Sequence, residues 1–192
     1  MKSIKENLTN ELIIKNSKFI ANIYKISNSN INDYLDNIKK EYPKATHYCY
    51  AYIYNDIKKS SDDGEPTNTA GMPLLNVLEK ENLNNILVIV VRYFGGIKLG
   101  AGGLIRAYTK SLTEALKQAK YINLEPGYKI TISFDYNNEK QVNYLLEDSN
   151  IIEKEYKDKI KYQVLVNKNI LEKLHNYDYE ILEEVYIEKD SN

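Results

Sequence analysis

The sequence is poor in residues that form covalent or metal cross-links. Its 192 residues include one cysteine, Cys49, and two histidines, His47 and His175. A single cysteine cannot form an internal disulfide bond, and these three residues are too few for a closed structural zinc site. A hydrophobic core must therefore hold the fold together, and a chain of this length can bury one as one large domain or two small ones.

Long apolar segments are also missing. No apolar run approaches the roughly 20 residues that a helix needs to span a bilayer. Residues 1–7 lack the apolar core of a signal peptide. The hydrophobic fraction (43%) and the charged fraction (28%) are those of a soluble globular protein. We therefore expect a cytoplasmic protein that does not enter a membrane.

Charge is distributed unevenly, although the net charge is only −1. Residues 1–123 contain 17 lysines and arginines and 12 acidic residues, a net charge of +5. Residues 124–192 contain 9 and 15, a net charge of −6. Such asymmetry indicates two bodies with different surfaces, and a polyanion should prefer the first.

One segment of the first body holds most of the glycine. Residues 86–91 form an apolar, mostly β-branched run, and helical spacing of apolar residues begins near Leu104. The pattern predicts a buried strand, a loop and a helix. Five of the eight glycines lie between them: Gly95, Gly96, Gly100, Gly102 and Gly103. Because glycine loses the most backbone entropy on ordering, we expect positive φ angles or close backbone approach in this loop.

Two interpretations of the glycine-rich loop stay open. The N-terminus of the following helix suits a phosphate or carboxylate, and Arg92, Lys98 and Arg106 could add charge. The known motifs fail, because a Walker A sequence needs Lys-Ser/Thr at 101–102 and a dinucleotide fingerprint needs glycine at Ile105. The alternative is that the glycines only make a tight, closely packed turn.

A second candidate segment lies at 55–70, which lacks apolar periodicity and predicts an exposed, mobile loop. Asp62, Asp63 and Glu65 provide enough oxygen ligands to help hold Mg²⁺, the one cofactor that the sequence suggests. The alternative is a solvated acidic turn. We expect Thr69 to cap the helix that follows.

Residues 46–54 alternate as in a strand, with four tyrosines on one face and His47, Cys49, Ala51 and Ile53 on the other. His47 is either a polar residue at the end of the strand or a member of a site. The tyrosines could stack on nucleic-acid bases or pack in the core. Two strands at 11–15 and 19–26 and a helix at 31–42 precede this segment.

Residues 125–127 break the pattern and predict a boundary between a domain at 1–123 and a domain at 124–192. The second domain reads strand, helix, strand, strand, helix, strand, which is the ferredoxin-like order. The strands are expected at 128–136, 151–156, 159–166 and 181–187, and the helices at 139–148 and 170–177. The fold class is therefore α+β with two domains.

Several motifs together resemble the signature of the IMPACT/YigZ family. They are residues 90–108, residues 62–73 and Ser17-Lys18-Phe19. The resemblance covers about the first 120 residues. It implies an N-terminal α/β domain similar to the second domain of a small-subunit ribosomal protein, and a C-terminal domain similar to the last domain of elongation factor G. Eukaryotic members restrain an amino-acid-starvation kinase that acts on translation initiation, by competing for its activator.

We expect the acidic segment, His47 and the glycine-rich loop to converge on one surface, where Arg92 or Arg106 pairs with an acidic residue. The candidate residues for anion or partner binding are His47, Asp62, Asp63, Gly64, Glu65, Arg92, Tyr93, Gly95, Gly96, Lys98, Gly100, Gly102, Gly103 and Arg106. No catalytic residue is assigned, because no nucleophile with a paired base is identified.

Two functions are compatible with these observations. The first is a non-enzymatic regulator or adaptor, linked to translation and the stress response, that binds a protein or ribosomal RNA through the N-terminal domain. The acidic second domain is a poor nucleic-acid binder, because such binding depends on neutralising phosphates. The alternative is an enzyme acting on a phosphorylated small molecule or nucleotide at the glycine-rich loop, by analogy with galactokinase-type kinases. The sequence does not indicate an oligomeric state.

Overall fold

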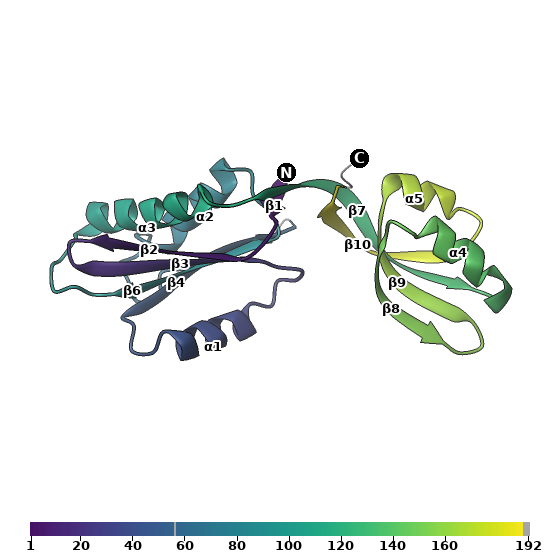
Figure 1. Cartoon of the computed structure of the whole chain (residues 1–192), viewed down its shortest axis with the longest axis horizontal. Coiled ribbons are helices and arrows are strands. Elements are labelled where there is room, and N and C mark those ends of the chain that lie inside the picture. The colour runs from purple at the N-terminus through teal and green to yellow at the C-terminus, as the bar shows by residue number, and fades with distance from the viewer. Residues whose placement is uncertain (56, 190–192) are drawn as a thin grey trace. The chain divides into compact units, whose positions relative to one another are not determined.

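The computed structural model describes residues 1–55 and 57–189. The fold is α+β, with more strand than helix. The chain divides into two compact units, residues 1–122 and residues 123–192, and each is described by itself (Figure 1). In the described part of the chain, none of the helices is both long enough and apolar enough to cross a membrane.

The first unit is built on a five-stranded antiparallel sheet. Its order is β2 (Leu8–Ile14), β3 (Ser17–Lys25), β6 (Ile86–Tyr93), β4 (His47–Tyr54) and β5 (Ile57–Ser61). The central strand β6 contains the apolar run at 86–91, and all six of these side chains are fully buried. The prediction of a strand covered on both faces is therefore confirmed.

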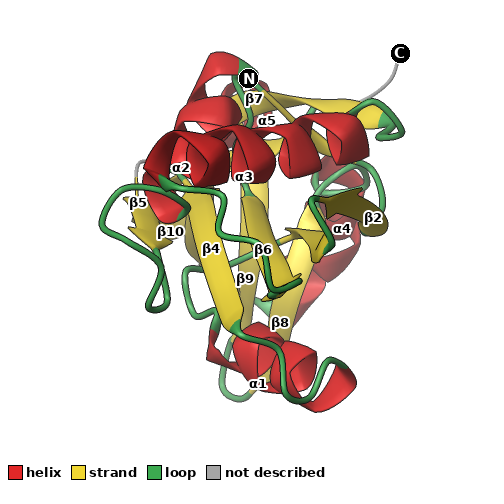
Figure 2. Cartoon of the chain, turned by 90° about the vertical axis from the view of Figure 1, so that its left-hand side faces the viewer, coloured by secondary structure: helices red, strands yellow, loops and turns green. Residues whose placement is uncertain are grey.

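Helices cover both faces of this sheet (Figure 2). Helices α2 (Gly71–Lys80) and α3 (Ala101–Leu116) pack on one face, and α1 (Asn32–Glu41) packs on the other. Alternate residues of β6 enter the two cores: Ile86, Val88 and Val90 face α2 and α3, whereas Leu87, Ile89 and Val91 face α1. The sheet therefore has a core on each side.

Three local features of this unit extend or correct the sequence predictions. The turn between β2 and β3 is made by Lys15 and Asn16, both at positive φ, so Ser17 lies in β3 and is buried. Part of the predicted loop at 55–70 is the edge strand β5. Of the two roles left open for the tyrosines of β4, the structure favours core packing: they lie beneath α1, where Tyr52 is 3% exposed and the other three are partly buried.

The second unit has the predicted order of elements. These are β7 (Tyr121–Phe134), α4 (Glu139–Leu145), β8 (Asn150–Tyr156), β9 (Ile160–Asn167), α5 (Lys168–Lys173) and β10 (Asp178–Glu188), with a 3₁₀ turn η1 (Tyr136–Asn138) before α4. The sheet order is β10-β7-β9-β8, and all neighbouring pairs are antiparallel. Side chains from α4 and α5 complete its core.

Residues 125–127 do not interrupt the strand pattern, because they lie inside β7, although the two units divide within one residue of the predicted domain boundary. The start of β7 pairs with β1 (Lys2–Ile4), and β7 then continues as the central strand of the second sheet. Pro126 fits here because its strand neighbour is β10 alone, since pairing with β9 begins at Gly127. The two units are therefore joined through a strand.

We expect residues 123–189 to fold as a separate fragment. All β7–β10 pairs from Leu124 to Ser133 and the whole second core lie within it. The fragment should give dispersed amide resonances and a cooperative thermal transition. A spectrum typical of an unfolded chain would contradict this expectation and show that the second unit needs the first to fold.

Candidate functional site

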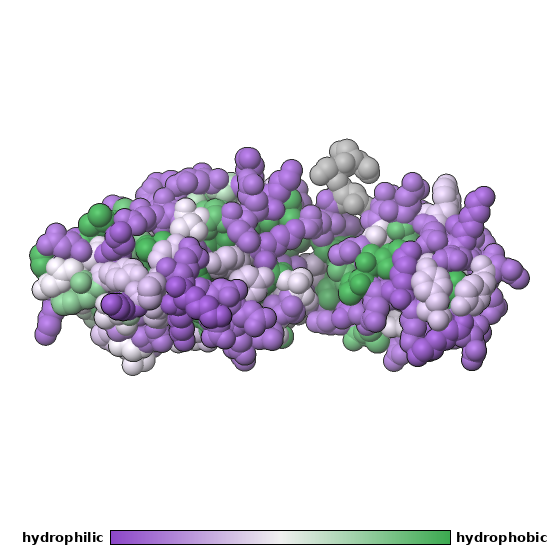
Figure 3. All heavy atoms as spheres, turned by 60° about the horizontal axis from the view of Figure 1, so that its bottom comes forward, coloured by the Kyte–Doolittle hydropathy of each residue, from purple (hydrophilic) through white to green (hydrophobic). Residues whose placement is uncertain are grey.

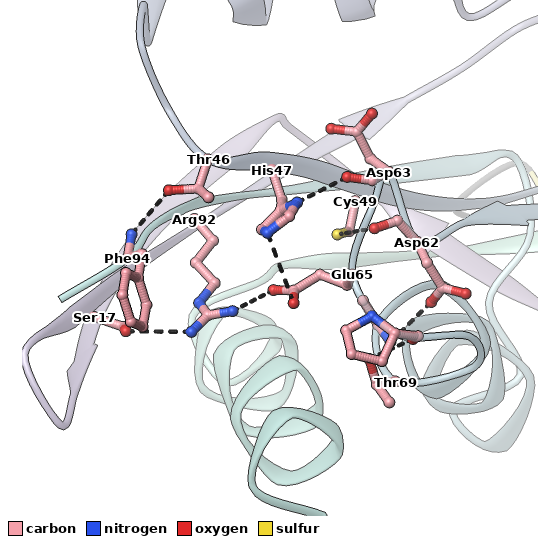
Figure 4. A network of polar contacts seen from close by, with 12 residues as sticks. Ser17, Thr46, His47, Cys49, Asp62, Asp63, Glu65, Thr69, Arg92 and Phe94 are labelled. Atoms are coloured by element: carbon pink, nitrogen blue, oxygen red, sulfur yellow. Dashed lines mark hydrogen bonds and ion pairs between the residues drawn. The ribbon is translucent and has the colours of Figure 1, made fainter. Parts of the chain in front are cut away.

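A buried ion pair lies at the centre of the signature residues (Figure 4). Arg92 of β6 is 5% exposed, and Glu65, which follows β5, is 8% exposed. Glu65 Oε1 accepts hydrogen bonds from Arg92 Nη1 at 2.5 Å and from the hydroxyl of Tyr108 at 2.8 Å. The expectation that an arginine pairs with one of the three acidic residues is met by this pair, not by Arg106.

His47 lies on the other side of the same carboxylate. Its Nδ1 is 2.8 Å from the carbonyl oxygen of Asp63, which can only accept, so Nδ1 carries the proton and donates it. Its Nε2 then points toward Glu65 Oε2, at 3.7 Å. His47 is therefore a member of the cluster as well as the first residue of β4.

The carboxylate of Asp62 caps helix α2. Its Oδ1 accepts from the backbone N–H groups of Ala70 and Gly71, and its Oδ2 accepts from that of Asn68. A carboxylate at a helix N-terminus satisfies free N–H groups and interacts favourably with the helix dipole. The predicted cap was Thr69, but the hydroxyl of Thr69 donates instead to the carbonyl of Pro66.

Asp63 fixes the acidic segment to β4. Its Oδ2 accepts from the backbone N–H of Tyr48 at 2.6 Å. Asp63 and Gly64 both have positive φ, and Gly64 lies against the ring of His47. Asp63 and Gly64 are exposed as predicted, whereas Glu65 is buried, and hydrogen bonds from Tyr48 and from the start of α2 hold the segment in place.

These contacts leave little support for Mg²⁺. The three carboxylates point to different partners: a helix N-terminus, a strand amide, and the buried pair with Arg92. Among residues 1–55 and 57–189, no group of three or more histidine, cysteine, aspartate or glutamate side chains could hold a metal ion. The acidic residues serve the fold of this segment.

Cys49 lies beneath the cluster, on the same face of β4 as His47. Its Sγ is 2.9 Å from the carbonyl oxygen of Asp62 and 3.3 Å from the hydroxyl of Tyr108. Burial raises the pKa of the Cys49 thiol to about 12 and raises the pKa of Tyr108 still further. Since the thiolate is the nucleophile, Cys49 is not a reactive group at neutral pH.

The glycine-rich loop, residues 94–100, is attached to the same cluster at its start. The backbone N–H of Gly95 donates to Ser17 Oγ at 3.1 Å, and Arg92 Nη2 reaches the same oxygen at 3.4 Å. A Cβ atom at Gly95 would lie 2.0 Å from the backbone carbon of Asn16. Close backbone approach therefore explains this glycine.

The other glycines have different roles. Gly96 and Gly100 have the expected positive φ angles, 83° and 69°, with open space where a side chain would be. Gly102 and Gly103 are not in the loop, because α3 begins at Ala101, three residues earlier than predicted. The loop is therefore shorter than the sequence suggested.

The structure brings together only part of the predicted set. His47, residues 62–65, Arg92 and Gly95 form one cluster. Lys98 and Arg106 are exposed and, in the described part of the chain, pair with none of the three acidic residues. The side chain of Tyr93 donates to the carbonyl of Pro43, away from the cluster.

The sequence interpretation missed two members of the cluster. Ser17 belongs to a motif that was noted, and Tyr108 belongs to the apolar stripe of α3. A tyrosine hydroxyl that is carried into a core usually needs a hydrogen-bond partner. From this rule, the sequence could have predicted that a polar group lies beside the hydroxyl of Tyr108.

Residues 15–116 match the Impact N-terminal domain family. This range contains the whole cluster, from Ser17 to Tyr108. The chain belongs to the IMPACT family. It is 37% identical to IMPACT family member YvyE of Bacillus subtilis over 172 residues, which cover 86% of this chain and 79% of YvyE.

Further relatives span different shares of this IMPACT family chain. IMPACT family member YigZ of Escherichia coli is 35% identical over 130 residues, 64% of either chain. Protein IMPACT of Homo sapiens is 43% identical over 67 residues, 32% of this chain and 20% of the human protein. A crystal structure of a hypothetical protein is similar over 98% of both chains, with 27% identity and a TM-score of 0.71.

The protonated, buried state of Cys49 predicts its reactivity. In the native protein at pH 7.5, Cys49 should react with a thiol reagent such as DTNB far more slowly than in the protein unfolded by urea. Because the pKa is raised by burial, native reactivity should not increase through pH 8 to 9, where a free thiol ionises. Labelling at the rate of a free thiol would contradict this account of the cluster.

Two glycine-to-alanine variants separate the roles within the glycine-rich region. Gly95→Ala should destabilise the fold by about 1–3 kcal/mol or more, because its Cβ would overlap the backbone of the β2–β3 turn. Gly102→Ala should be neutral or stabilise by up to about 1 kcal/mol, because it lies in a helix with space around it. Urea unfolding measures both, and equal effects would contradict the assignment.

Proposed function

We propose that this IMPACT family chain is a non-enzymatic regulator or adaptor, linked to translation, that acts through a macromolecular partner. The main observation behind the proposal is that the acidic side chains and the thiol of this region are hydrogen-bonded or buried within the protein. The carboxylates of Asp62, Asp63 and Glu65 all accept hydrogen bonds within the protein, and the thiol of Cys49 is buried. An acid, base or nucleophile must reach a substrate, and these groups are committed elsewhere.

The glycine-rich loop presents exposed side chains beside the cluster. Phe94 and Ile97 are 47% and 45% exposed, and Lys98 between Ile97 and the start of α3 is also exposed. Hydrogen bonds from Phe94 to Thr46 and from Gly95 to Ser17 hold the loop in place. A positioned loop with exposed apolar and cationic side chains suits the surface of a partner.

The link to translation rests on the family and on domain likeness. We propose that the first unit is similar to the second domain of a small-subunit ribosomal protein. We also propose that the second unit is a ferredoxin-like domain similar to the last domain of elongation factor G. The net charge of +5 at residues 1–123 favours the first unit as the one that meets RNA or an acidic protein. A cytoplasmic location and a role in the stress response belong to the same proposal.

One observation favours the alternative, an enzyme acting on a phosphorylated small molecule or nucleotide. Helix α3 begins at the loop with no acidic residue in its first turn, and the guanidinium of Arg106 lies beside Gly102. That end of the helix could accept a phosphate. The proposed function is preferred because Asp62, Asp63 and Glu65, the candidate metal ligands or bases, already accept hydrogen bonds within the protein.

The test uses a reconstituted bacterial translation system and purified 70S ribosomes. The full chain should change the rate of reporter synthesis and should pellet with ribosomes or with one translation factor. The double variant Ile97→Asp/Lys98→Glu should lose both effects, because it replaces an exposed apolar and an exposed cationic side chain of the loop by two acidic ones. Its thermal stability should match the wild type, since both side chains are exposed.

The matched control is Ile13→Asp, which changes an isoleucine that is 64% exposed on the edge strand β2. The control should behave as the wild type does. The proposal fails if the chain has no effect on translation, or if the loop variant and the control behave alike. Saturable ATP or GTP binding that the loop variant abolishes would instead support the enzyme.

A further inference from the structure

Three loops lie at one end of the sheet in the first unit (Figure 1). The pairing register places the first residues of β3 and β4 beside the last residues of β6, so the segments that adjoin these residues lie together. The segments are the β2–β3 turn (residues 15–16), residues 42–46 before β4, and the glycine-rich loop after β6. Because neighbouring strands are about 4.8 Å apart, the three loops extend across about 10–15 Å.

Contacts between these loops fix their positions. The backbone N–H of Phe94 donates to Thr46 Oγ1 at 3.0 Å, and the hydroxyl of Tyr93 donates to the carbonyl of Pro43 at 3.2 Å. Gly95 adjoins the backbone of the β2–β3 turn so closely that a Cβ atom would have no room. The loops therefore form one continuous surface, which we call the three-loop surface.

The three-loop surface is cationic. Each loop has one exposed lysine, and the start of α3 adds an exposed arginine: Lys15, Lys44, Lys98 and Arg106. Within the residues that the structure describes, none of the four forms an ion pair with an acidic residue. The sequence has no acidic residue at all from 82 to 113, a segment that includes the whole glycine-rich loop.

The acidic side chains near this surface are already bonded or outnumbered. The three carboxylates of the acidic segment accept hydrogen bonds within the protein, and Glu11 pairs with Lys18 at 3.1 Å. Glu41, at the end of α1, follows two lysines in the same turn. A polyanion therefore meets a net positive charge at this end of the unit.

Phe94 places an aromatic ring among these cations. The residue is 47% exposed. Its ring lies 5.6 Å from the guanidinium carbon of Arg92, and its backbone is held by Thr46 (Figure 4). The guanidinium and the hydrogen bond position the ring, and its exposed part is free to stack on a base.

This combination favours single-stranded RNA over an acidic protein. Proteins that bind single strands without sequence preference combine cations along the backbone with aromatic side chains on which bases stack. A protein interface is more often marked by a broad apolar area. On the face of the chain seen in Figure 3, hydrophobic residues form only small areas between hydrophilic ones.

We propose that the three-loop surface binds single-stranded RNA, with the ring of Phe94 stacked on a base and the four exposed cations beside phosphates. The inference rests on the proposed function and names RNA as its macromolecular partner. Phosphate contacts and stacking carry little sequence information, so binding should tolerate changes of sequence. The tyrosines of β4, which pack beneath α1, take no part.

The test adds the full-length chain to a fluorescein-labelled single-stranded RNA of about 12 nucleotides, within the usual range of such sites, and measures fluorescence anisotropy. Each phosphate contact on a single strand contributes about −0.7 to the slope of log K against log[salt], so four contacts predict about −3. Lys44→Gln and Lys98→Gln should each make the slope less steep by about 0.7. The matched control, Lys80→Gln, should keep the wild-type slope, because Lys80 is at the opposite end of α2 from the acidic segment.

Two variants of Phe94 test the stacking separately from the charge. Phe94→Leu should weaken RNA binding by about fivefold or more and leave the salt slope unchanged. Phe94→Tyr keeps an aromatic ring and should bind as the wild type does. Circular dichroism shows that both variants are folded at the temperature of the assay.

Four results would overturn the proposal. These are the absence of saturable binding, a salt slope that Lys44→Gln and Lys98→Gln leave unchanged, equal affinities of Phe94→Leu and the wild type, and displacement of the RNA by polyglutamate at the same concentration of charge. The last result would make an acidic protein the occupant instead.

This proposal and the translation role can fail separately. Ribosome pelleting that the variant Ile97→Asp/Lys98→Glu loses, without RNA binding in the anisotropy assay, would support the translation role and overturn RNA as the partner. RNA binding with the predicted slope and no effect on reporter synthesis would support this proposal and overturn the translation role.

Discussion

The buried ion pair between Glu65 and Arg92 is the constraint on which the rest of the first unit depends. Both side chains are almost completely removed from water, where an unpaired charge would be very costly. Tyr108 and Ser17 add hydrogen bonds, and the rings of Phe19 and Phe94 lie 5.4 and 5.6 Å from the guanidinium carbon. The pair thereby connects β3, β6, α3 and the acidic segment.

This arrangement explains why the acidic residues that suggested a Mg²⁺ site in the sequence instead stabilise the fold. The buried carboxylate of Glu65 is stabilised by the guanidinium of Arg92 and the hydroxyl of Tyr108. Asp62 and Asp63 accept backbone hydrogen bonds that fix the segment containing Glu65. The same contacts set the start of the glycine-rich loop, because Ser17 is shared by Arg92 and Gly95. The exposed side chains of Phe94 and Ile97 lie on this loop, to which the proposed function assigns partner binding.

The sequence predicted those parts of the fold that depend on local patterns. Periodicity identified β6 and the apolar stripe of α3, because burial on fixed faces requires it. The expected convergence of the motifs also predicted that Arg92 or Arg106 pairs with Asp62, Asp63 or Glu65, and the observed pair is Arg92 with Glu65. The second unit was predicted in element order for the same reason.

The errors arose where a contact joins distant parts of the chain. Positive φ or close backbone approach was expected for the glycine-rich loop as a whole, but the sequence could not single out Gly95, because its neighbour Asn16 is far away in sequence. Asp62 caps a helix that begins nine residues later, which no local capping rule describes. Pro126 was taken as a break, because nothing in the sequence shows that β9 stops one residue short of it.

A double-mutant cycle on Glu65 and Arg92 tests the central claim most directly. Urea unfolding of Glu65→Gln, Arg92→Met and the double variant gives the coupling free energy. The account predicts that each single change costs about 3 kcal/mol, because it leaves one buried charge unpaired. The double variant should cost much less than the sum, with a coupling of about 2 kcal/mol or more. Additive effects would show that the pair does not hold the unit together.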